Sequence, residues 1–294
     1  MTRIADLLGI GPSFSFEFFP PRNDAEQATL VQTLRDLEPL APSFVSVTYR
    51  GGRSSRQRTH DLVAGMLRTT SLTPMAHLTC SVHSRLELAE ILLDLRRAGV
   101  ENLLALGGDP PPDDEAVHAE LHHAIELVEL ARAIGGFSIG VAAHPELHPR
   151  SGGDRAFDRE QLVAKLALAD FAVTQFFFRT DDYLGLVDDL AERGMHKPVL
   201  PGVMPITSVS GITRMAELSG TAVPPEVVRR IEAVSGDPVA VRATGVEIAT
   251  ELCQELLAAG VPGLHFYTLN RSTATREIYR RLGLGPSGAG DASR

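Results

Sequence analysis

The order of apolar and amphipathic segments limits this chain to a small group of folds. Eight short apolar runs alternate with longer stretches in which apolar residues recur at helical spacing. Strands that alternate with helices predict a parallel sheet, because each parallel connection needs a crossover. Eight such units within 294 residues predict a (β/α)8 barrel. The runs are residues 13–19, 44–49, 75–80, 102–107, 138–143, 171–178, 198–204 and 263–269.

The segments between these runs supply the helices of the predicted barrel. Residues 85–99 and 119–135 each place apolar side chains near one helical face. The stretch 206–262 is too long for one helix, so we expect two or three, one beginning at the VPPE segment and the last covering 239–259. A doubly wound open sheet is the alternative, but no glycine-rich turn follows the first apolar run to support it.

The composition is that of an acidic globular protein. A net charge of −9 argues against a broad nucleic-acid surface. Two cysteines, Cys80 and Cys253, are too few for a disulfide framework and fit a reducing cytoplasm. We find neither a signal-peptide core nor the roughly 20 consecutive apolar residues of a membrane span. We therefore expect one catalytic domain over 1–284 and a flexible tail over 285–294, with no nucleic-acid or membrane partner and with homo-oligomerisation left open.

The first apolar run, SFSFEFFPPR, contains an unusual acidic residue. Alternation along a strand places Phe14, Phe16 and Phe18 on one face and Ser15 and Glu17 on the other. A buried carboxylate without a partner is costly, so Glu17 either has a partner or belongs to a site that uses its properties.

Other predicted strands also end in polar residues. In a (β/α)8 barrel, the carboxyl ends of all strands meet at the face that carries the active site. We therefore predict a ligand site there. The strand-end residues are Glu17, Thr48, His77, Asp109, His144, Gln175, and Asn270 with Arg271. The histidines lack the spacing of a zinc site, so no metal is predicted.

Eight motifs occur in an order that resembles the catalytic domain of the methylenetetrahydrofolate reductase family. They cover residues 10–283 and read FSFEFFPPR, FVSVTY, AHLTC, NLLALGGDPP, VAAHPELHP, TQFFF, PGVMPI and HFYTLNR. The resemblance implies a (β/α)8 barrel that reduces 5,10-methylenetetrahydrofolate to 5-methyltetrahydrofolate. It also implies a nicotinamide donor, for which we favour NADH over NADPH, and a bound FAD.

The resemblance assigns catalytic roles to two carboxylic acids. Glu17 matches the general acid that protonates folate N10, and we expect an apolar barrel mouth to raise its pKa. A pairing of Glu17 with a barrel arginine or lysine is the alternative. Asp109 matches a catalytic and cofactor-contacting residue between folate and flavin, the alternative being a turn residue before Pro110.

Two further groups of residues are implied by the same resemblance. Gln175, Arg271 and Tyr267 fall on the substrate side, where Gln175 would bind the pterin and Arg271 would clamp the folate carboxylate. The cofactor side comprises Thr48, His77, Asp109, His144, Asp158 and Lys165. Each has a structural alternative: a backbone-bonded Gln175, a surface Arg271, or an Asp158 and a Lys165 on a solvated helix face.

The chain departs from the family pattern mainly on the cofactor side. These departures are Gly107, His123, His144, Ala164 and Val209, which stand where flavin-stacking, phosphate-pairing or ring-packing groups are common in the family. A flavin-free reductase, in which the nicotinamide passes its hydride directly to folate, is therefore an alternative. A folate-dependent methyltransferase or demethylase on the same barrel, and a folate-binding protein without activity, are the other functions considered.

Overall fold

The computed structural model describes residues 2–49, 53–81, 83–108 and 119–284, and its centre is a closed barrel of parallel strands. The strands follow one another around the barrel in sequence order, so the predicted (β/α)8 fold is confirmed and the doubly wound alternative is wrong. The expected tail 285–294 lies outside the described residues. The strands are β1 Ser13–Phe18, β2 Phe44–Val47, β3 Pro74–Thr79, β4 Asn102–Leu106, β5 Ser138–Ala143, β6 Phe171–Phe176, β7 Val199–Val203 and β8 Gly263–Tyr267.

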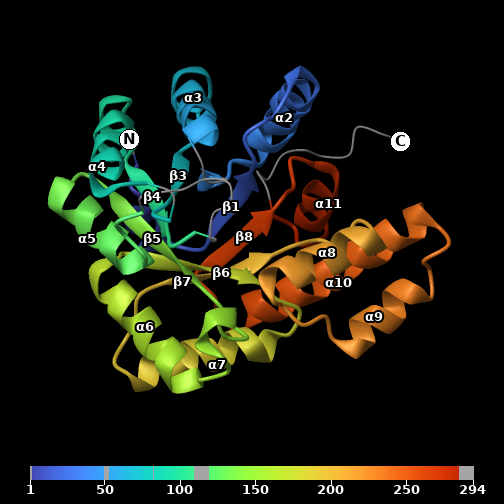
Figure 1. The fold of residues 1–294 in the computed structure, drawn as a ribbon. Helices are drawn as coiled ribbons and strands as arrows, with labels where there is room; N and C mark the ends of the chain where they lie inside the picture. The colour runs from blue at the N-terminus through green and yellow to red at the C-terminus, as the bar shows by residue number, and fades with distance from the viewer. Residues whose placement is uncertain (1, 50–52, 82, 109–118, 285–294) are drawn as a thin grey trace.

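Helices surround the barrel and cover its outer surface (Figure 1). The predicted segments 85–99 and 119–135 contain α4 and α5, and the stretch 206–262 contains three helices, α8 to α10. The helices are α1 Ile4–Leu8, α2 Asp24–Leu37, α3 Arg53–Thr69, α4 Arg85–Arg97, α5 Ala124–Ile134, α6 Arg155–Leu168, α7 Thr180–Glu192, α8 Val209–Ser219, α9 Pro225–Glu232, α10 Pro238–Ala258 and α11 Thr273–Arg281. Two short 3-10 helices are η1 Glu38–Leu40 and η2 Pro149–Ser151.

Local sequence signals set the ends of these helices. At α4, the Ser84 side chain accepts a hydrogen bond from the Glu87 N–H while the Glu87 carboxylate accepts one from the Ser84 N–H, which forms a capping box. Gly99 follows the same helix with φ +87°, a conformation that glycine adopts without a steric cost.

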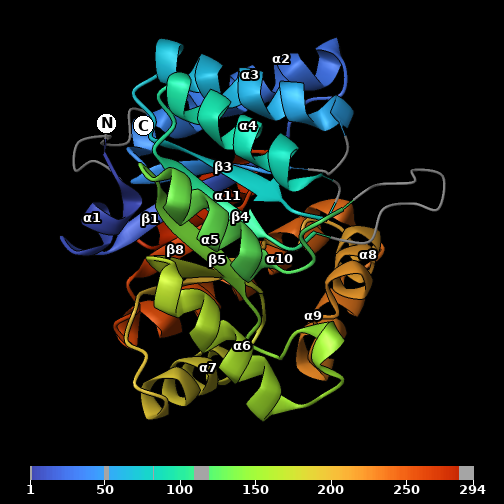
Figure 2. The same ribbon diagram turned by 60° about the vertical axis from the view of Figure 1, so that its left-hand side comes forward.

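Apolar side chains fill the barrel interior near the amino-terminal ends of the strands. Ile4 of α1 is fully buried with a cluster that includes Phe44, Leu104 and Phe171. The Phe171 ring lies 2.6 Å from the position that a Cβ on Gly140 would occupy, so only glycine fits there. In Figure 2, α1 lies at the opposite end of the barrel from α8. Among the described residues, this packing fills the end of the barrel opposite the carboxyl ends of the strands.

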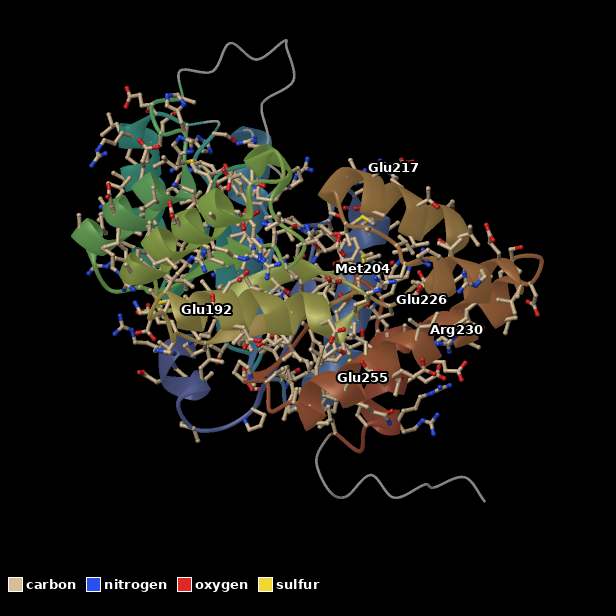
Figure 3. The ribbon with its side chains drawn as sticks, turned by 90° about the horizontal axis from the view of Figure 1, so that it is seen from below. Glu192, Met204, Glu217, Glu226, Arg230 and Glu255 are labelled. Carbon is tan, nitrogen blue, oxygen red and sulfur yellow. The ribbon has the colours of Figure 1, made fainter. Side chains whose placement is uncertain are left out.

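The helices α8, α9 and α10 form a separate packed layer beside the mouth of the barrel. Met204 follows β7 and is buried with Ile212, Val227, Ile231 and Val241 from these helices. Figure 3 shows Met204 between α8, which carries Glu217, and α9, which carries Glu226 and Arg230.

The first strand has the two faces that its sequence predicts. Phe16 and Phe18 are fully buried in the core between the barrel and its helices, and Phe16 packs on Tyr279 of α11. Ser15 and Glu17 point toward side chains of β2, β3 and β8 instead. Within the described residues, no helix has the length and apolar character needed to span a membrane.

Candidate active site

Glu17 lies at the centre of a buried polar cluster inside the barrel. Strand register pairs it with Ser46 of β2 on one side and with Tyr267 of β8 on the other. Its Oε2 atom accepts a hydrogen bond from the Ser46 hydroxyl at 3.4 Å and lies 3.4 Å from His265 Nε2 and 3.6 Å from His77 Nε2. Glu17, Ser46, His77 and His265 are all buried.

The surroundings of Glu17 differ from the expectation of a mainly apolar mouth. Only the outward face of β1 is apolar, whereas the inward face meets a hydroxyl group and two imidazoles. In the described part of the chain, no arginine or lysine pairs with Glu17, which argues against the alternative of a structural ion pair. The Oε1 atom accepts no hydrogen bond from the described residues, so this oxygen is available to a ligand.

His77 belongs to the Glu17 cluster rather than to a separate group on the barrel rim. Burial lowers the pKa of His77 to about 4, with the nearby Glu17 raising it and His265 lowering it further. The imidazole is therefore neutral at pH 7. Its Nε2 atom has no hydrogen-bond partner among the described residues.

His265 is a member of the cluster that the sequence reasoning did not identify. It is fully buried on β8, where its Nδ1 lies 2.7 Å from Ser15 Oγ and its Nε2 faces Glu17. The signal was present in the motif HFYTLNR, because alternation places His265 and Tyr267 on the same face of the strand.

The predicted substrate residue Tyr267 crosses the barrel interior. Its hydroxyl donates to the Thr174 carbonyl of β6 at 2.6 Å, and its ring lies edge-on to His265. Burial, and secondarily Glu17, raises the pKa of Tyr267 well above its usual value, so this phenol stays protonated. The ring can therefore form a wall of the site, while its hydroxyl is already bonded to the backbone.

A second buried acidic residue lies on the opposite side, beside β5. Asp158 of α6 accepts a hydrogen bond from the His148 N–H at 2.9 Å and forms an ion pair with Arg159 at 2.6 Å. Arg159 is 1% exposed and also pairs with Asp189 at 2.9 Å. It further donates to the carbonyl oxygens of His144 and Pro145. The structural alternative of a solvated helix face is wrong for Asp158, because this residue is buried and both of its oxygens are bonded within the protein.

Basic groups cluster around this ion pair. Lys165 donates to the Ala142 carbonyl at 2.8 Å, and burial lowers its pKa to about 8, with Asp158 partly opposing that effect. The His144 ring lies 4.5 Å from that of His148. Burial lowers the pKa of His144 to about 3, helped by the positive charges of His148, Lys165 and Arg159. His144 is therefore neutral at pH 7, and Lys165 is the group whose charge changes near that pH.

The predicted pterin-binding residue Gln175 lies between these two sides. Its Oε1 accepts a hydrogen bond from the Phe176 N–H at 3.0 Å, which matches the backbone-bonded alternative for this atom. Its side-chain amide nitrogen has no hydrogen bond within the described residues, so a donor remains for a ligand. Gln175 and His144 line a small cavity that is closed by Gly220 and Thr221 beyond α8.

Two features beside the mouth bear on a flavin cofactor. The Thr48 hydroxyl at the end of β2 is buried without a hydrogen-bond partner among the described residues, as a cofactor-contacting group would be before binding. At Gly107, a side chain would meet only the backbone nitrogen of Ala124, at 3.8 Å. The residues present therefore fit a flavin at Thr48, whereas Asp158 offers it no free oxygen. Three other residues also depart from the family pattern. His123 precedes α5, Val209 begins α8, and Ala164 lies on α6.

The loop after β8 holds the end of β1 in place. The Asn270 side chain accepts from the Phe19 N–H at 2.7 Å and donates to the Phe19 carbonyl at 2.9 Å. Leu269 and Asn270 both have positive φ angles, 51° and 57°, which are unusual for residues other than glycine. Arg271 follows as an exposed residue whose guanidinium has no partner among the described residues. Asp109, expected to be both catalytic and cofactor-contacting, lies outside the described residues.

Comparison with known proteins gives one consistent family. A family model described as methylenetetrahydrofolate reductase matches residues 5–283. The chain is 36% identical to the 5,10-methylenetetrahydrofolate reductase of Pectobacterium carotovorum, with 92% of this chain and 90% of that protein aligned. The chain is 34% identical to the Escherichia coli protein of the same name, with 92% of this chain and 91% of that protein aligned. A protein of Arabidopsis thaliana, methylenetetrahydrofolate reductase (NADH) 1, is 35% identical over 92% of this chain and 48% of its own length.

Solved structures with similar folds are more distant in sequence. An uncharacterized protein from Clostridium thermocellum, described as binding two copies of 5-methyl-5,6,7,8-tetrahydrofolic acid, has a TM-score of 0.62 at 11% identity. The alignment covers 93% of this chain and 94% of that protein. A thermostable aldo-keto reductase has a TM-score of 0.53 at 14% identity, and the alignment covers 94% of this chain and 92% of that protein. At these identities the likeness concerns the barrel fold alone.

Proposed function

This chain belongs to the methylenetetrahydrofolate reductase family, and we propose that it reduces 5,10-methylenetetrahydrofolate to 5-methyltetrahydrofolate with a nicotinamide dinucleotide as electron donor. The family membership gives the oxidoreductase activity and the folate substrate. The geometry of the barrel interior supports the assignment of the individual residues. NADH is the donor that we propose, as in the name of the relative from Arabidopsis thaliana.

The observation that carries the proposal is the environment of the Glu17 carboxylate. Glu17 is buried at the carboxyl ends of the strands, and the described residues place only a hydroxyl group and two histidines beside it. Asp158 has a permanent positive charge beside it, that of Arg159. Glu17 has no such partner among the described residues, which suits a group that must gain and lose a proton.

The chemical step needs a proton on N10 of the folate. We assign its delivery to Glu17 Oε1, because Oε2 is held by Ser46 and His265 while Oε1 has no hydrogen bond from the described residues. As the proton arrives, the bond between the methylene carbon and N10 breaks and its electrons pass to N10. The methylene carbon becomes part of an N5-iminium cation, which then accepts a hydride.

Other residues of the site are proposed to orient the folate. Gln175 offers its free amide N–H groups to the pterin, and the Tyr267 ring forms the wall opposite. The exposed guanidinium of Arg271 can pair with the carboxylate tail of the substrate in a two-point contact. Asp109 is proposed to contact the pterin from the loop after β4.

A flavin is proposed as the cofactor, with Thr48 and Lys165 as contacts on its polar side. The unpartnered Thr48 hydroxyl and the unused donors of Lys165 support this assignment. A flavin bound here would supply hydride transfer between the nicotinamide and the folate. His77 lies beside Glu17, so its proposed contact with the cofactor would come from the barrel interior.

A flavin-free reductase is the second candidate, favoured by the bonding of Asp158. Both of its oxygens are occupied by Arg159 and the His148 N–H, and Gly107 provides no side chain near the mouth. In that version the nicotinamide and the folate bind together and the hydride passes directly between them, which predicts ternary-complex kinetics.

Product formation and the absorption spectrum test the two versions. The purified protein is mixed with NADH and methylenetetrahydrofolate, and 5-methyltetrahydrofolate is measured by chromatography. Absence of this product, with and without added FAD, would refute the proposed function. A colourless protein that forms the product without FAD would select the flavin-free version, and a yellow protein the flavin version.

The Gly107→Arg variant sharpens the same test. Because a side chain fits at this position, an arginine there can add one charge-assisted contact of roughly 1.5–3 kcal/mol. We expect FAD to bind about tenfold or more tightly, as measured by flavin fluorescence during titration. An unchanged affinity would show that position 107 does not face the flavin.

A further inference from the structure

Glu17 is held by a histidine to which the chemical step above assigns no part. We propose that His265 is a positioning residue for Glu17, and that Ser15 holds the His265 ring in the tautomer with its hydrogen on Nε2. The inference rests on the proposed function, because it gives His265 a part in the proton transfer that this function requires.

Strand register brings the three side chains together. Ser15 and His265 are paired residues of β1 and β8, and Glu17 lies two positions further along β1 on the same face. The Ser15 hydroxyl lies 2.7 Å from His265 Nδ1, and His265 Nε2 lies 3.4 Å from Glu17 Oε2. The order Ser15, His265, Glu17 is therefore built into the pairing of two barrel strands rather than into a loop.

The His265 ring is fixed by its packing as well as by its hydrogen bonds. It is fully buried, lies nearly parallel to the Phe44 ring at 5.9 Å and stands edge-on to Tyr267 at 5.3 Å. A ring enclosed in this way has one orientation, which keeps Nδ1 toward Ser15 and Nε2 toward Glu17. Residues that are locked by packing and by a second hydrogen bond are those that hold catalytic groups in productive geometry.

The partners of the ring determine its tautomer. Nε2 faces a carboxylate oxygen, which can only accept a hydrogen bond when ionised. Nδ1 faces a hydroxyl whose other nearby acceptor, the Leu264 carbonyl, is more distant at 3.5 Å. Both ring nitrogens have a hydrogen-bond partner when the Ser15 hydroxyl donates to Nδ1 and the Nε2–H group donates to Glu17.

This tautomer favours the charge that forms when Glu17 gives its proton to the folate. The carboxylate is met at Oε2 by Nε2–H and by the Ser46 hydroxyl, so negative charge develops against donors that are already in place. Among the described residues, the other titratable groups that face Glu17 are His77 of β3 and Tyr267 of β8. The Nε2 atom of His77, which lies 3.6 Å from Glu17 Oε2, has no hydrogen bond in the described structure.

Three substitutions of His265 separate positioning from packing. His265→Gln places an amide N–H near the position of Nε2, His265→Asn is too short to reach Glu17, and His265→Phe keeps a ring against Phe44. We expect kcat to fall about tenfold to a hundredfold in the Asn and Phe variants, with KM within about twofold of the wild type. The Gln variant should retain at least tenfold more activity than either of the other two. A packing role predicts that Phe is the best replacement, and that order would overturn the proposal.

Serine variants on the same face of β1 provide a matched pair. Ser15→Ala removes the contact with Nδ1, whereas Ser13→Ala makes the same change two residues earlier, at a buried hydroxyl without a partner among the described residues. We expect kcat to fall about threefold to tenfold in Ser15→Ala and to stay within about twofold in Ser13→Ala. Equal effects of the two substitutions would contradict the assignment.

Nitrogen NMR of the His265 ring tests the tautomer without an activity assay. The wild type and Ser13→Ala should show the hydrogen on Nε2, and Ser15→Ala should show a mixed or reversed tautomer. A wild-type ring with its hydrogen on Nδ1 refutes the inference even if the enzyme forms 5-methyltetrahydrofolate. If no product forms but the tautomer depends on Ser15, the proposed function fails while the positioning of Glu17 stands.

Discussion

The two sides of the barrel mouth each contain a buried carboxylate, but their partners differ. Glu17 faces a hydroxyl group and two histidines at 3.4–3.6 Å, and no lysine or arginine among the described residues. Asp158 pairs at 2.6 Å with Arg159, which is itself almost fully buried. The charge beside Asp158 is permanent, whereas the groups beside Glu17 can be neutral.

The difference supports the separate roles that we propose for the two carboxylates. Arg159 pairs with Asp158 and donates to the carbonyl oxygens of His144 and Pro145, so this buried pair stabilises the segment after β5. An acid beside neutral hydrogen-bonding groups can exchange a proton with a ligand. The side near Glu17 therefore suits proton transfer, and the side near Asp158 suits the binding of an anionic group.

The largest expected effect is on the activity of Glu17→Gln. The amide keeps the shape of the side chain but cannot deliver a proton, so kcat should fall by about 10²–10⁴-fold. Folate binding, measured by titration calorimetry, should stay within about threefold of the wild type. Near-normal turnover in this variant would show that Glu17 is not the acid, and the comparison of the two sides would then fail.

Arg159→Met should show the largest effect on stability. The substitution leaves Asp158 buried without its charged partner, a change that costs about 3–5 kcal/mol of unfolding free energy in comparable sites. Urea denaturation followed by circular dichroism measures this loss. Arg155→Met is the matched control, because Arg155 pairs with the same Asp189 at 2.8 Å from an exposed position. It should cost less than about 1 kcal/mol, and similar losses in both variants would count against a special role for the buried pair.

The pH dependence of stability should change in His77→Gln. The pKa of His77 is about 4 in the folded chain, against 6.5 for an ordinary histidine. Between these two pH values the ring is therefore protonated in the unfolded chain and neutral in the folded chain. Stability contributed by the neutral ring is therefore lost as pH falls from 6.5 to 4, by up to about 3 kcal/mol.

The His77→Gln variant should lack this component, so its unfolding free energy should decline less over the same interval. Denaturation at a series of pH values measures the difference. His122→Gln, at an exposed position, is the control and should follow the wild-type curve. Identical slopes for wild type and His77→Gln would show that His77 is not held neutral beside Glu17.

The smallest expected effect concerns Lys165 and the pH dependence of cofactor binding. Because the pKa of Lys165 is about 8, its positive charge is lost as pH rises through that value. Affinity for a phosphate-bearing dinucleotide should then weaken by about tenfold between pH 7 and 9.5, the scale of one charge-assisted contact. Lys165→Arg keeps its charge and should bind with little change over this range. Fluorescence titration measures both affinities. Equal pH dependence in the wild type and in Lys165→Arg would show that Lys165 does not contact the phosphates of the dinucleotide.

Much of the fold was readable from the sequence because its signals are local. The eight apolar runs correspond to the eight strands, and alternation along the first run correctly placed Phe16 and Glu17 on opposite faces. Three helices lie within the stretch 206–262, for which its length predicted two or three. These features depend on spacing between near neighbours, which sequence preserves.

The expectations about individual environments were less accurate. The mouth around Glu17 was expected to be apolar, because the strand that carries Glu17 is rich in phenylalanine and the strand-end residues could not be placed at contact distance from it. The polar neighbours come from three other strands. Asp158 was assigned to a solvated helix face or to a cofactor, because its pairing with Arg159 depends on how α6 packs on the loop after β5.

The sequence by itself determined the order of the elements, the inward direction of Glu17 and the family. Only the tertiary structure decided which groups meet Glu17, since Ser46, His77 and His265 reach it through strand register and closure of the barrel. Register joins residues as far apart as 17 and 265, and spacing along the chain carries no record of that contact. The chemistry of the buried acid is therefore a property of the closed barrel, although the acid itself was visible in its first strand.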